Sequence, residues 1–177
     1  PHWDQLIRER GWILQEDSIF KLWYTGSQEG GAKKLGYATS EDGLHWQRYQ
    51  ADPIFDERWI EDVIITKHQD IYFIFAESQR DGIQLLSSPD GIVWTFLWEI
   101  SIHSRKRNQN IAAPIGTSIA WQENNLWYLL YEQDDKGIWL ATSHDMKEWK
   151  NVQDDPVLNL GPDSHDDRLI AANQIIK

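Results

Sequence analysis

The chain alternates between short apolar runs and clusters of turn-forming residues, and the stretch from Ile60 to Trp94 shows this pattern most clearly. Within it lie three runs rich in β-branched and aromatic residues, at 63–65, 71–77 and 83–87. Turn formers such as the His-Gln-Asp of 68–70 separate the runs, and no run has the apolar spacing of a helix. The stretch is therefore predicted to form a small antiparallel meander.

The same order of strands recurs along the chain, and a seven-residue signature marks the end of each copy. The signature has Ser first, Asp third and Trp seventh, and it occupies 40–46, 88–94 and 143–149. A short strand is expected before each signature, at 35–39, 83–87 and 138–142. An aromatic-rich strand is expected before each of those, at 19–26, 71–77 and 126–132. Three copies in one order indicate a repeat protein.

The turn inside the signature depends on a residue that accepts positive φ. Gly43 and Gly91 supply it in the first two copies, whereas Met146 stands there in the third. A turn of a different type is therefore expected at Met146. The signature Trp is expected to pack the edge of its sheet against the neighbouring sheet. Such turns are common hairpin corners, so the signature by itself indicates fold and not activity.

Four-stranded meanders that repeat every 45 to 55 residues or so are typical of a β-propeller. The predicted fold is an all-β propeller of four-stranded antiparallel blades, with 1–177 as a single domain. Complete blades are expected at about 8–55, 56–110 and 111–160. Residues 2–6 resemble the fourth strand of a preceding blade, and 166–177, within a partial blade at 161–177, resemble the first strand of a following one. An open arc exposes apolar faces, which predicts either a fragment of a longer enzyme or a homo-oligomer that completes the propeller.

Composition and charge narrow the range of partners. The chain of 177 residues is 41% hydrophobic, as expected of a globular domain, and its formal net charge of -11 disfavours nucleic acid and anionic membranes. No run approaches the roughly 20 apolar residues of a membrane-spanning helix. The basic cluster at 105–107 is interpreted as a solvated loop. The absence of cysteine excludes thiolate chemistry and leaves the compartment open.

Several blade-building segments resemble a known group of enzymes. These segments are Trp23–Gly26, Gly36–Gly43, Trp46, Asp52–Phe55 and the similar blade exit Asp155–Leu158. They resemble the five-bladed propeller glycosidases, namely glycoside hydrolase families 43, 32, 62 and 68, and the related mannoside phosphorylases of family 130. Because those families have about five blades, the resemblance implies that roughly two blades are absent from this chain.

The resemblance implies chemistry at a glycosidic bond, performed by acidic residues that open the inner strands and face the central cavity. One carboxylic acid must protonate the leaving oxygen, and a second carboxylate must act as base or nucleophile. Asp62 matches the family pattern, and Glu61-Asp62 is similar to the Glu-Asp-Pro of the phosphorylases, although Val63 replaces the proline. Asp62 and Glu61 are therefore the catalytic candidates, with Asp62 as transition-state stabiliser or pKa modulator. The competing interpretation of Asp62 is a turn residue at the start of a strand.

The corresponding positions of the other blades are not acidic. Alignment of the aromatic strands places Gly11, Thr117 and Ala172 where Asp62 stands. Either the missing acids belong to blades outside this chain, or the site has lost catalysis and kept binding. The alternative function is a non-catalytic carbohydrate-binding or protein-assembly module.

Five further side chains are substrate-binding candidates, namely Trp59, Glu77, Glu132, Asp167 and Arg168. The flat ring of Trp59 suits the apolar face of a sugar, with blade packing as its competing role. Glu77 and Glu132 end equivalent strands, where a solvated strand end is the simpler interpretation. Arg168 is expected to orient a carboxylate or a sugar hydroxyl.

An oxygen-rich loop offers ligands that suit Ca²⁺. It contains Asp163, His165, Asp166 and Asp167, and its spacing does not fit the helix-loop-helix site. No other metal and no cofactor is expected, because the sequence has no phosphate-binding glycine loop, nucleophile elbow or pair of zinc ligands. Carbohydrate is the expected partner.

Overall fold

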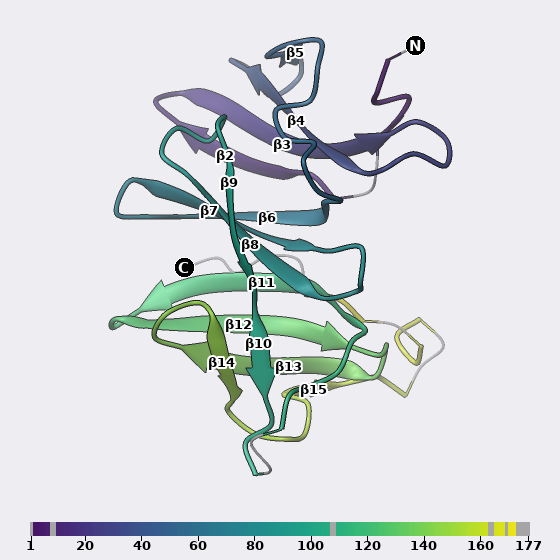
Figure 1. Cartoon of the computed structure of the whole chain (residues 1–177), viewed down its shortest axis with the longest axis vertical. Coiled ribbons are helices and arrows are strands. Elements are labelled where there is room, and N and C mark those ends of the chain that lie inside the picture. Colours follow the sequence, from purple (N-terminus) through teal and green to yellow (C-terminus); the bar gives the residue numbers. More distant parts are fainter. Residues whose placement is uncertain (1, 8–9, 107–108, 163–164, 169, 173–177) are drawn as a thin grey trace.

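The computed structural model describes residues 2–7, 10–106, 109–162, 165–168 and 170–172. The regular elements of these residues are β-strands, and among them there is no helix that could cross a membrane. The strands form three sheets, stacked in chain order along the long axis of the molecule (Figure 1). The all-β class expected from the sequence is confirmed.

The first sheet is a meander of β2 (Trp12–Glu16), β3 (Ile19–Ser27), β4 (Lys34–Ser40) and β5 (Gln47–Arg48). The strand β1 (Leu6–Ile7) pairs with the end of β3 and so belongs to this sheet, whereas the sequence placed residues 2–6 in a preceding blade. Side-chain contacts explain the placement. Trp3 stacks on Tyr24 with ring centroids 5.9 Å apart, and the buried Asp4 carboxylate accepts hydrogen bonds from Tyr24 and Arg48.

The second sheet contains β6 (Glu61–His68), β7 (Ile71–Glu77), β8 (Ile83–Ser88) and β9 (Thr95–Glu99) in sequential order. Each strand pairs antiparallel with the next, so the central stretch of the chain is the predicted meander. His68 is the last residue of β6, and its ring lies edge-on to Trp127 of the third sheet at 5.3 Å.

The third sheet receives a strand from the segment that precedes it. Its meander comprises β11 (Ile115–Glu123), β12 (Leu126–Gln133), β13 (Gly137–Ser143) and β14 (Glu148–Asn151), with β15 (Leu158–Asn159) paired to β13. The strand β10 (Ser101–His103) pairs in parallel with β14, and Figure 1 shows the chain running from β9 in the second sheet to β10 in the third. The division into blades at 8–55, 56–110 and 111–160 stays a prediction. The strand β10 lies before the second of these boundaries but pairs with the sheet that follows it.

The C-terminal segment forms no strand among residues 165–168 and 170–172. The sequence predicted the first strand of a further blade over 166–177. Residues 169 and 173–177 of that range lie outside the described part of the chain.

The first two strands of each meander are joined by the same tight turn. Its two central residues have positive φ in all three sheets, namely Asp17-Ser18, Gln69-Asp70 and Asn124-Asn125. Two consecutive residues in this conformation form the hairpin turn whose twist matches that of the flanking strands. Asp and Asn tolerate it better than most residues, which explains the polar composition of these turns.

The signature turns are alike in all three copies, which corrects the expectation for Met146. Met146 has a φ of 61°, close to the 74° of Gly43 and the 79° of Gly91. The Oγ of Ser143 accepts a hydrogen bond from the Met146 amide, and Asp145 accepts two from the next two amides. The same bonds occur around Asp42 and Asp90. These side-chain bonds hold the turn, so glycine is not required.

Two hydrophobic clusters lie between the sheets, and the alternation of β-strand side chains assigns residues to each. Ile74 and Leu86 of the second sheet join the cluster against the first sheet. Their neighbours Phe75 and Leu85 point the other way, into the cluster against the third sheet. The middle sheet is therefore buried on both faces.

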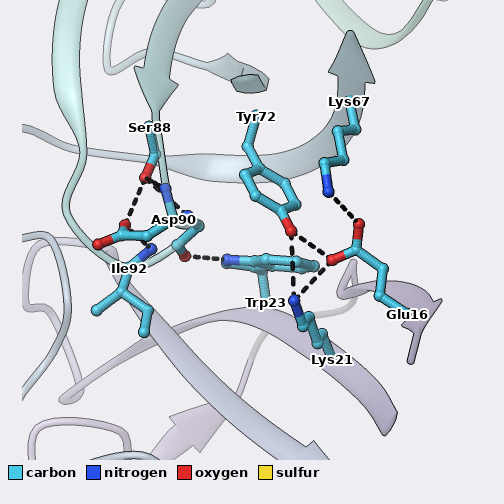
Figure 2. Close-up of polar contacts among 9 residues, drawn as sticks. Glu16, Lys21, Trp23, Lys67, Tyr72, Ser88, Asp90 and Ile92 are labelled. Carbon is cyan, nitrogen blue, oxygen red and sulfur yellow. Dashed lines mark hydrogen bonds and ion pairs between the residues drawn. The ribbon is translucent and has the colours of Figure 1, made fainter. Parts of the chain in front are cut away.

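Polar contacts also link the first and second sheets. Trp23 is fully buried in β3, and its indole N–H donates to the carbonyl of Gly91, 2.7 Å away (Figure 2). Beside it, Glu16 of the first sheet accepts hydrogen bonds from Lys21, Lys67 and Tyr72. Burial opposes ionisation of Glu16, but these three donors outweigh it and lower its pKa to about 2. We call Glu16, Lys21, Lys67 and Tyr72 the Glu16 clasp.

Candidate functional site

A bulge at the start of β6 carries the catalytic candidates. Glu61 pairs with Glu77, and Ile64 pairs with Phe75, so Asp62 and Val63 together face the single residue Ala76. Asp62 has a φ of 49°, a conformation that is rare inside a strand. An extra residue of this kind redirects side chains, and such bulges are frequent beside active sites.

The third sheet has a bulge at the same place. The register of β11 shifts between Gly116 and Ile119, and Gly116 pairs with Glu132 as Glu61 pairs with Glu77. Thr117 therefore occupies the position of Asp62, as the sequence alignment places it. The bulge is a property of the repeat, whereas the carboxylate in it belongs to the second sheet alone.

In the first sheet the alignment is wrong by one residue. Trp12 pairs with Trp23 in the way that Ile64 pairs with Phe75, so the position of Asp62 is held by Arg10 and not by Gly11. The Nε of Arg10 lies 3.8 Å from Oδ2 of Asp62. Equivalent positions of adjacent sheets thus place a guanidinium beside the carboxylate.

The surroundings of Glu77 raise the pKa of its carboxyl group well above the ordinary value. Burial raises its pKa, and the negative charges of Asp62, Glu61, Asp81 and Glu132 raise it further, to about 7. Near neutral pH the side chain is therefore present in both protonated and ionised forms. A carboxyl group of this kind is able to donate a proton at the pH where ordinary carboxylates are fully ionised.

Glu132 of β12 approaches Glu77 from the third sheet. Its side chain is buried, and burial raises its pKa, with the charges of Asp135 and Asp134 adding to the effect while a hydrogen bond from the Asp135 amide opposes it. A Cβ on Gly116 would lie 3.4 Å from Oε2 of Glu77 and 3.7 Å from Oε2 of Glu132. The two carboxyl groups therefore flank the same glycine.

These residues line a cleft of about 270 Å³, which we call the acidic cleft. Its walls include Glu77 and Asp81 from the second sheet and Gly116, Glu132 and Asp134 from the third. The cleft lies where the second and third sheets meet, beside the bulge that holds Asp62. It combines a readily protonated carboxyl group with neighbouring acidic side chains, which is the pairing that acid-base chemistry on a glycoside needs.

Glu61 and Trp59 are joined through Lys33. The ammonium of Lys33 lies 3.8 Å from Oε1 of Glu61 and 5.8 Å from the centre of the Trp59 ring, in a cation-π contact. Trp59 lines a separate hollow on the second sheet, together with Arg58 and Gln84. The structure thus brings Asp62, Glu61, Glu77 and Glu132 together. Trp59 lies next to this group, but it lines a different hollow.

The remaining candidates lie elsewhere. Asp167 and Arg168 are exposed in the segment after β15, and no described contact joins them to the acidic cleft. Asp163 of the expected calcium loop lies outside the described residues. Within the described part of the chain, no group of three or more His, Cys, Asp or Glu side chains is arranged to hold a metal ion.

Sequence reasoning missed three residues of the site, namely Arg10, Lys33 and Asp81. Arg10 and Lys33 reach it from the first sheet by ion pairs, and Asp81 reaches it from the turn after β7. None belongs to a recognisable motif. The strand repeat could have identified Arg10, because Arg10 lies two residues before Trp12 just as Asp62 lies two residues before Ile64.

Comparison with known proteins gives a consistent result for the fold. No protein-family model matches the sequence, and neither does any curated protein. Solved structures match with high probability. A glycosyl hydrolase from Bacteroides ovatus superposes with a TM-score of 0.67 at 15% identity, over 89% of this chain and 53% of its own.

Two further structures extend the range of activities. A β-1,2-mannobiose phosphorylase from Listeria innocua gives a TM-score of 0.65 at 16% identity, over 91% of this chain and 62% of its own. An N-acetylgalactosamine deacetylase from F. plautii gives a TM-score of 0.66 at 17% identity, over 90% of this chain and 55% of its own. The chain spans little more than half the length of these structures. Its fold is that of the propeller glycosidases and phosphorylases, so the resemblance seen in the sequence is confirmed.

Proposed function

We propose that the acidic cleft binds a sugar unit and that the chain forms part of an enzyme that cleaves glycosidic bonds. The observation that carries this proposal is the meeting of Glu77 and Glu132 at Gly116, beside the bulge that holds Asp62. Burial and the surrounding acidic residues also raise the pKa of Glu77 to about 7. Glycoside cleavage requires one protonated carboxylic acid and one carboxylate on opposite sides of the reaction. The likeness to a glycosyl hydrolase and a mannobiose phosphorylase supports the same class of substrate.

In this proposal the roles divide between two carboxyl groups. Glu77 in its protonated form donates a proton to the departing sugar oxygen. Asp62 stays beside the guanidinium of Arg10 and stabilises positive charge that develops on the sugar ring in the transition state. Glu61 and Glu132 contribute negative charge that keeps the proton on Glu77, and Glu132 with Gly116 shapes the floor of the cleft.

A panel of nitrophenyl glycosides, assayed with and without inorganic phosphate, tests the proposal and separates hydrolysis from phosphorolysis. Asp62→Asn is expected to lower turnover of the nitrophenyl glycosides by a factor of about 100 or more, and Glu77→Gln is expected to do so with alkyl glycosides, whose leaving alkoxide needs the donated proton. Asp70→Asn is the matched control, because Asp70 also has positive φ and lies at the far end of the same hairpin. Turnover that survives both substitutions would remove these carboxyl groups from the mechanism.

A non-catalytic carbohydrate-binding module is the second candidate. Thr117 stands where a second inner-strand acid would be expected, so the bulge of the third sheet supplies no second carboxylate. A glycan array that reports binding, combined with no turnover in the glycoside panel, would favour this function.

A further inference from the structure

A second hollow on the middle sheet has the chemistry of an anion-binding sugar site. It encloses about 250 Å³ and is lined by side chains that include Arg58, Trp59, Ser78, Arg80 and Gln84. This volume lies just below the roughly 300–1,000 Å³ of typical ligand pockets, so the hollow suits a single small ring. We call it the arginine hollow.

The floor of the hollow is a fully buried glutamine with a fixed orientation. Gln84 is 0% exposed, and its Nε2 donates to the carbonyl of Trp59 at 2.6 Å and to that of Glu77 at 3.2 Å. Its Oε1 accepts a hydrogen bond from Nε of Arg58 at 3.3 Å. Gln84 therefore positions Arg58 and ties the arginine hollow to the strand that carries Glu77.

Arg58 is held in one orientation before any ligand arrives. Its guanidinium stacks on the ring of Phe96, with Cζ 3.9 Å from the ring centre, and one Nη donates to Glu99 at 3.1 Å. Among the described residues no partner is found for the other Nη. A guanidinium fixed by stacking loses little entropy when it binds a carboxylate.

A buried hydroxyl in the hollow has no partner. Ser78 is 5% exposed and its Oγ makes no hydrogen bond to any described residue. A buried polar group left unpaired costs about 1–3 kcal/mol, which a bound oxygen atom would recover. Because Ser78 lines the hollow, that oxygen would belong to whatever occupies it.

The charges of the hollow favour an anion. Arg58 is compensated by Glu99, whereas Arg80 projects from the turn after β7 and is paired with no described residue. This leaves a net positive charge beside the acidic cleft. Trp59 adds a flat apolar wall suited to the CH face of a sugar ring.

We propose that the arginine hollow binds a sugar that carries a negatively charged group, of which a hexuronate is the simplest example. The carboxylate pairs with Arg80 and Arg58, the ring lies against Trp59, and a ring hydroxyl reaches Ser78. The choice of a sugar as ligand rests on the proposed function, whereas the preference for an anion rests on the arginines alone.

Isothermal titration of the whole chain with D-glucuronate, D-glucose and inorganic sulfate tests the proposal. Glucuronate is expected to bind at least tenfold more tightly than glucose or sulfate. Arg80→Gln is expected to weaken glucuronate binding at least tenfold, and Ser78→Ala severalfold. Lys150→Gln, which removes one positive charge from an exposed position on β14, is expected to leave binding unchanged.

Each outcome decides between the explanations. Equal affinity for glucose and glucuronate, or unchanged binding in Arg80→Gln, would overturn the proposal. Sulfate that binds as tightly as glucuronate would overturn the sugar and assign the hollow to an inorganic anion. Glucuronate binding by a wild-type chain that turns over no glycoside would uphold the arginine hollow while removing the catalytic function.

Discussion

Glu77 and Glu132 belong to neighbouring sheets, yet their Oε2 atoms both lie within 4 Å of the point where a side chain on Gly116 would begin. The glycine belongs to β11 and lies directly before the bulge of that strand. It keeps the space between the two carboxyl groups open.

Gly116→Val is expected to fill the acidic cleft while leaving the sheets intact, because a Cβ there meets only the far ends of two flexible side chains. Sugar binding or turnover in the cleft should fall at least tenfold. Glucuronate binding in the arginine hollow should be unaffected, and thermal unfolding checks that the fold survives. Wild-type turnover in Gly116→Val would show that the reaction takes place elsewhere.

The pKa of Glu77 makes stability depend on pH in a particular direction. A carboxyl group raised from 4.5 to about 7 on folding binds more protons in the folded state between these values. Its contribution to the free energy of unfolding is therefore greatest below about pH 4.5 and falls by about 1–3 kcal/mol as the pH rises through 7.

Urea denaturation at pH 5, 6, 7 and 8 measures this dependence. Glu77→Gln is expected to flatten the curve between pH 5 and 8, since the amide does not titrate. Glu29→Gln is the control, because Glu29 is exposed and lies away from the cleft. Identical curves for wild type and Glu77→Gln would contradict the raised pKa.

The contribution of the Glu16 clasp to stability depends on pH in the opposite direction. Because Lys21, Lys67 and Tyr72 lower the pKa of Glu16 to about 2, its contribution to stability is complete above about pH 4.5 and is lost as the pH falls through 2. Glu16→Gln is expected to lower the free energy of unfolding at pH 7 by about 1–3 kcal/mol, since the partly buried Lys21 loses its counter-charge.

A double-mutant cycle with Lys67→Met isolates the contact between the two sheets. A coupling free energy near zero would show that the ion pair of Glu16 and Lys67 contributes nothing to stability. Glu41→Gln, at an exposed position of a signature turn, controls for the loss of one negative charge.

Gly91 and Gly43 form a matched pair in equivalent turns. Both have positive φ, but a Cβ on Gly91 would lie 2.8 Å from the buried ring of Trp23, whereas one on Gly43 meets nothing closer than 3.8 Å. Gly43→Ala is expected to cost about 1 kcal/mol from the backbone alone. Gly91→Ala is expected to cost about 2–4 kcal/mol, because a rigid, fully buried indole must also move.

Chemical denaturation of the two variants gives the comparison directly. Because the chain contains eleven tryptophans, the assigned NMR signal of the Trp23 indole N–H, and not total fluorescence, reports whether the indole has shifted in Gly91→Ala. Equal losses of unfolding free energy in the two variants would mean that Trp23 moves aside without an energetic cost.

The strands were predictable because each is a short apolar run closed by turn formers, and each run is long enough to cover one face of a neighbouring sheet. The aromatic strand predicted at 71–77 is β7 to the residue, and the one predicted at 126–132 ends one residue short of β12. The turn at Met146 was not predictable from propensity, since the hydrogen bonds of Ser143 and Asp145 outweigh the preference for glycine.

The site was predictable only in part, for a geometric reason. Asp62, Glu61 and Glu77 lie on one hairpin, so local pattern and strand pairing reveal them. Arg10 and Lys33 come from the preceding sheet, and their approach depends on how sheets stack, which no local pattern encodes. The position of Gly11 was wrong by one residue, because the equivalent pairs of Trp12 with Trp23 and of Ile64 with Phe75 fix the alignment only once the strand pairing is known.

Because the chain passes from β9 in the second sheet to β10 in the third, the sequence repeat and the unit that unfolds cooperatively have different boundaries. Since residues 101–103 hydrogen-bond to β14 in the following sheet, the second sheet cannot detach without stripping an edge strand from the third. The two sheets are therefore linked by an exchanged edge strand. A single repeat that ends at residue 110 would include β10 and would remove this edge strand from the third sheet. We therefore expect duplication or exchange of repeats to succeed only when the chain is cut before Ser101.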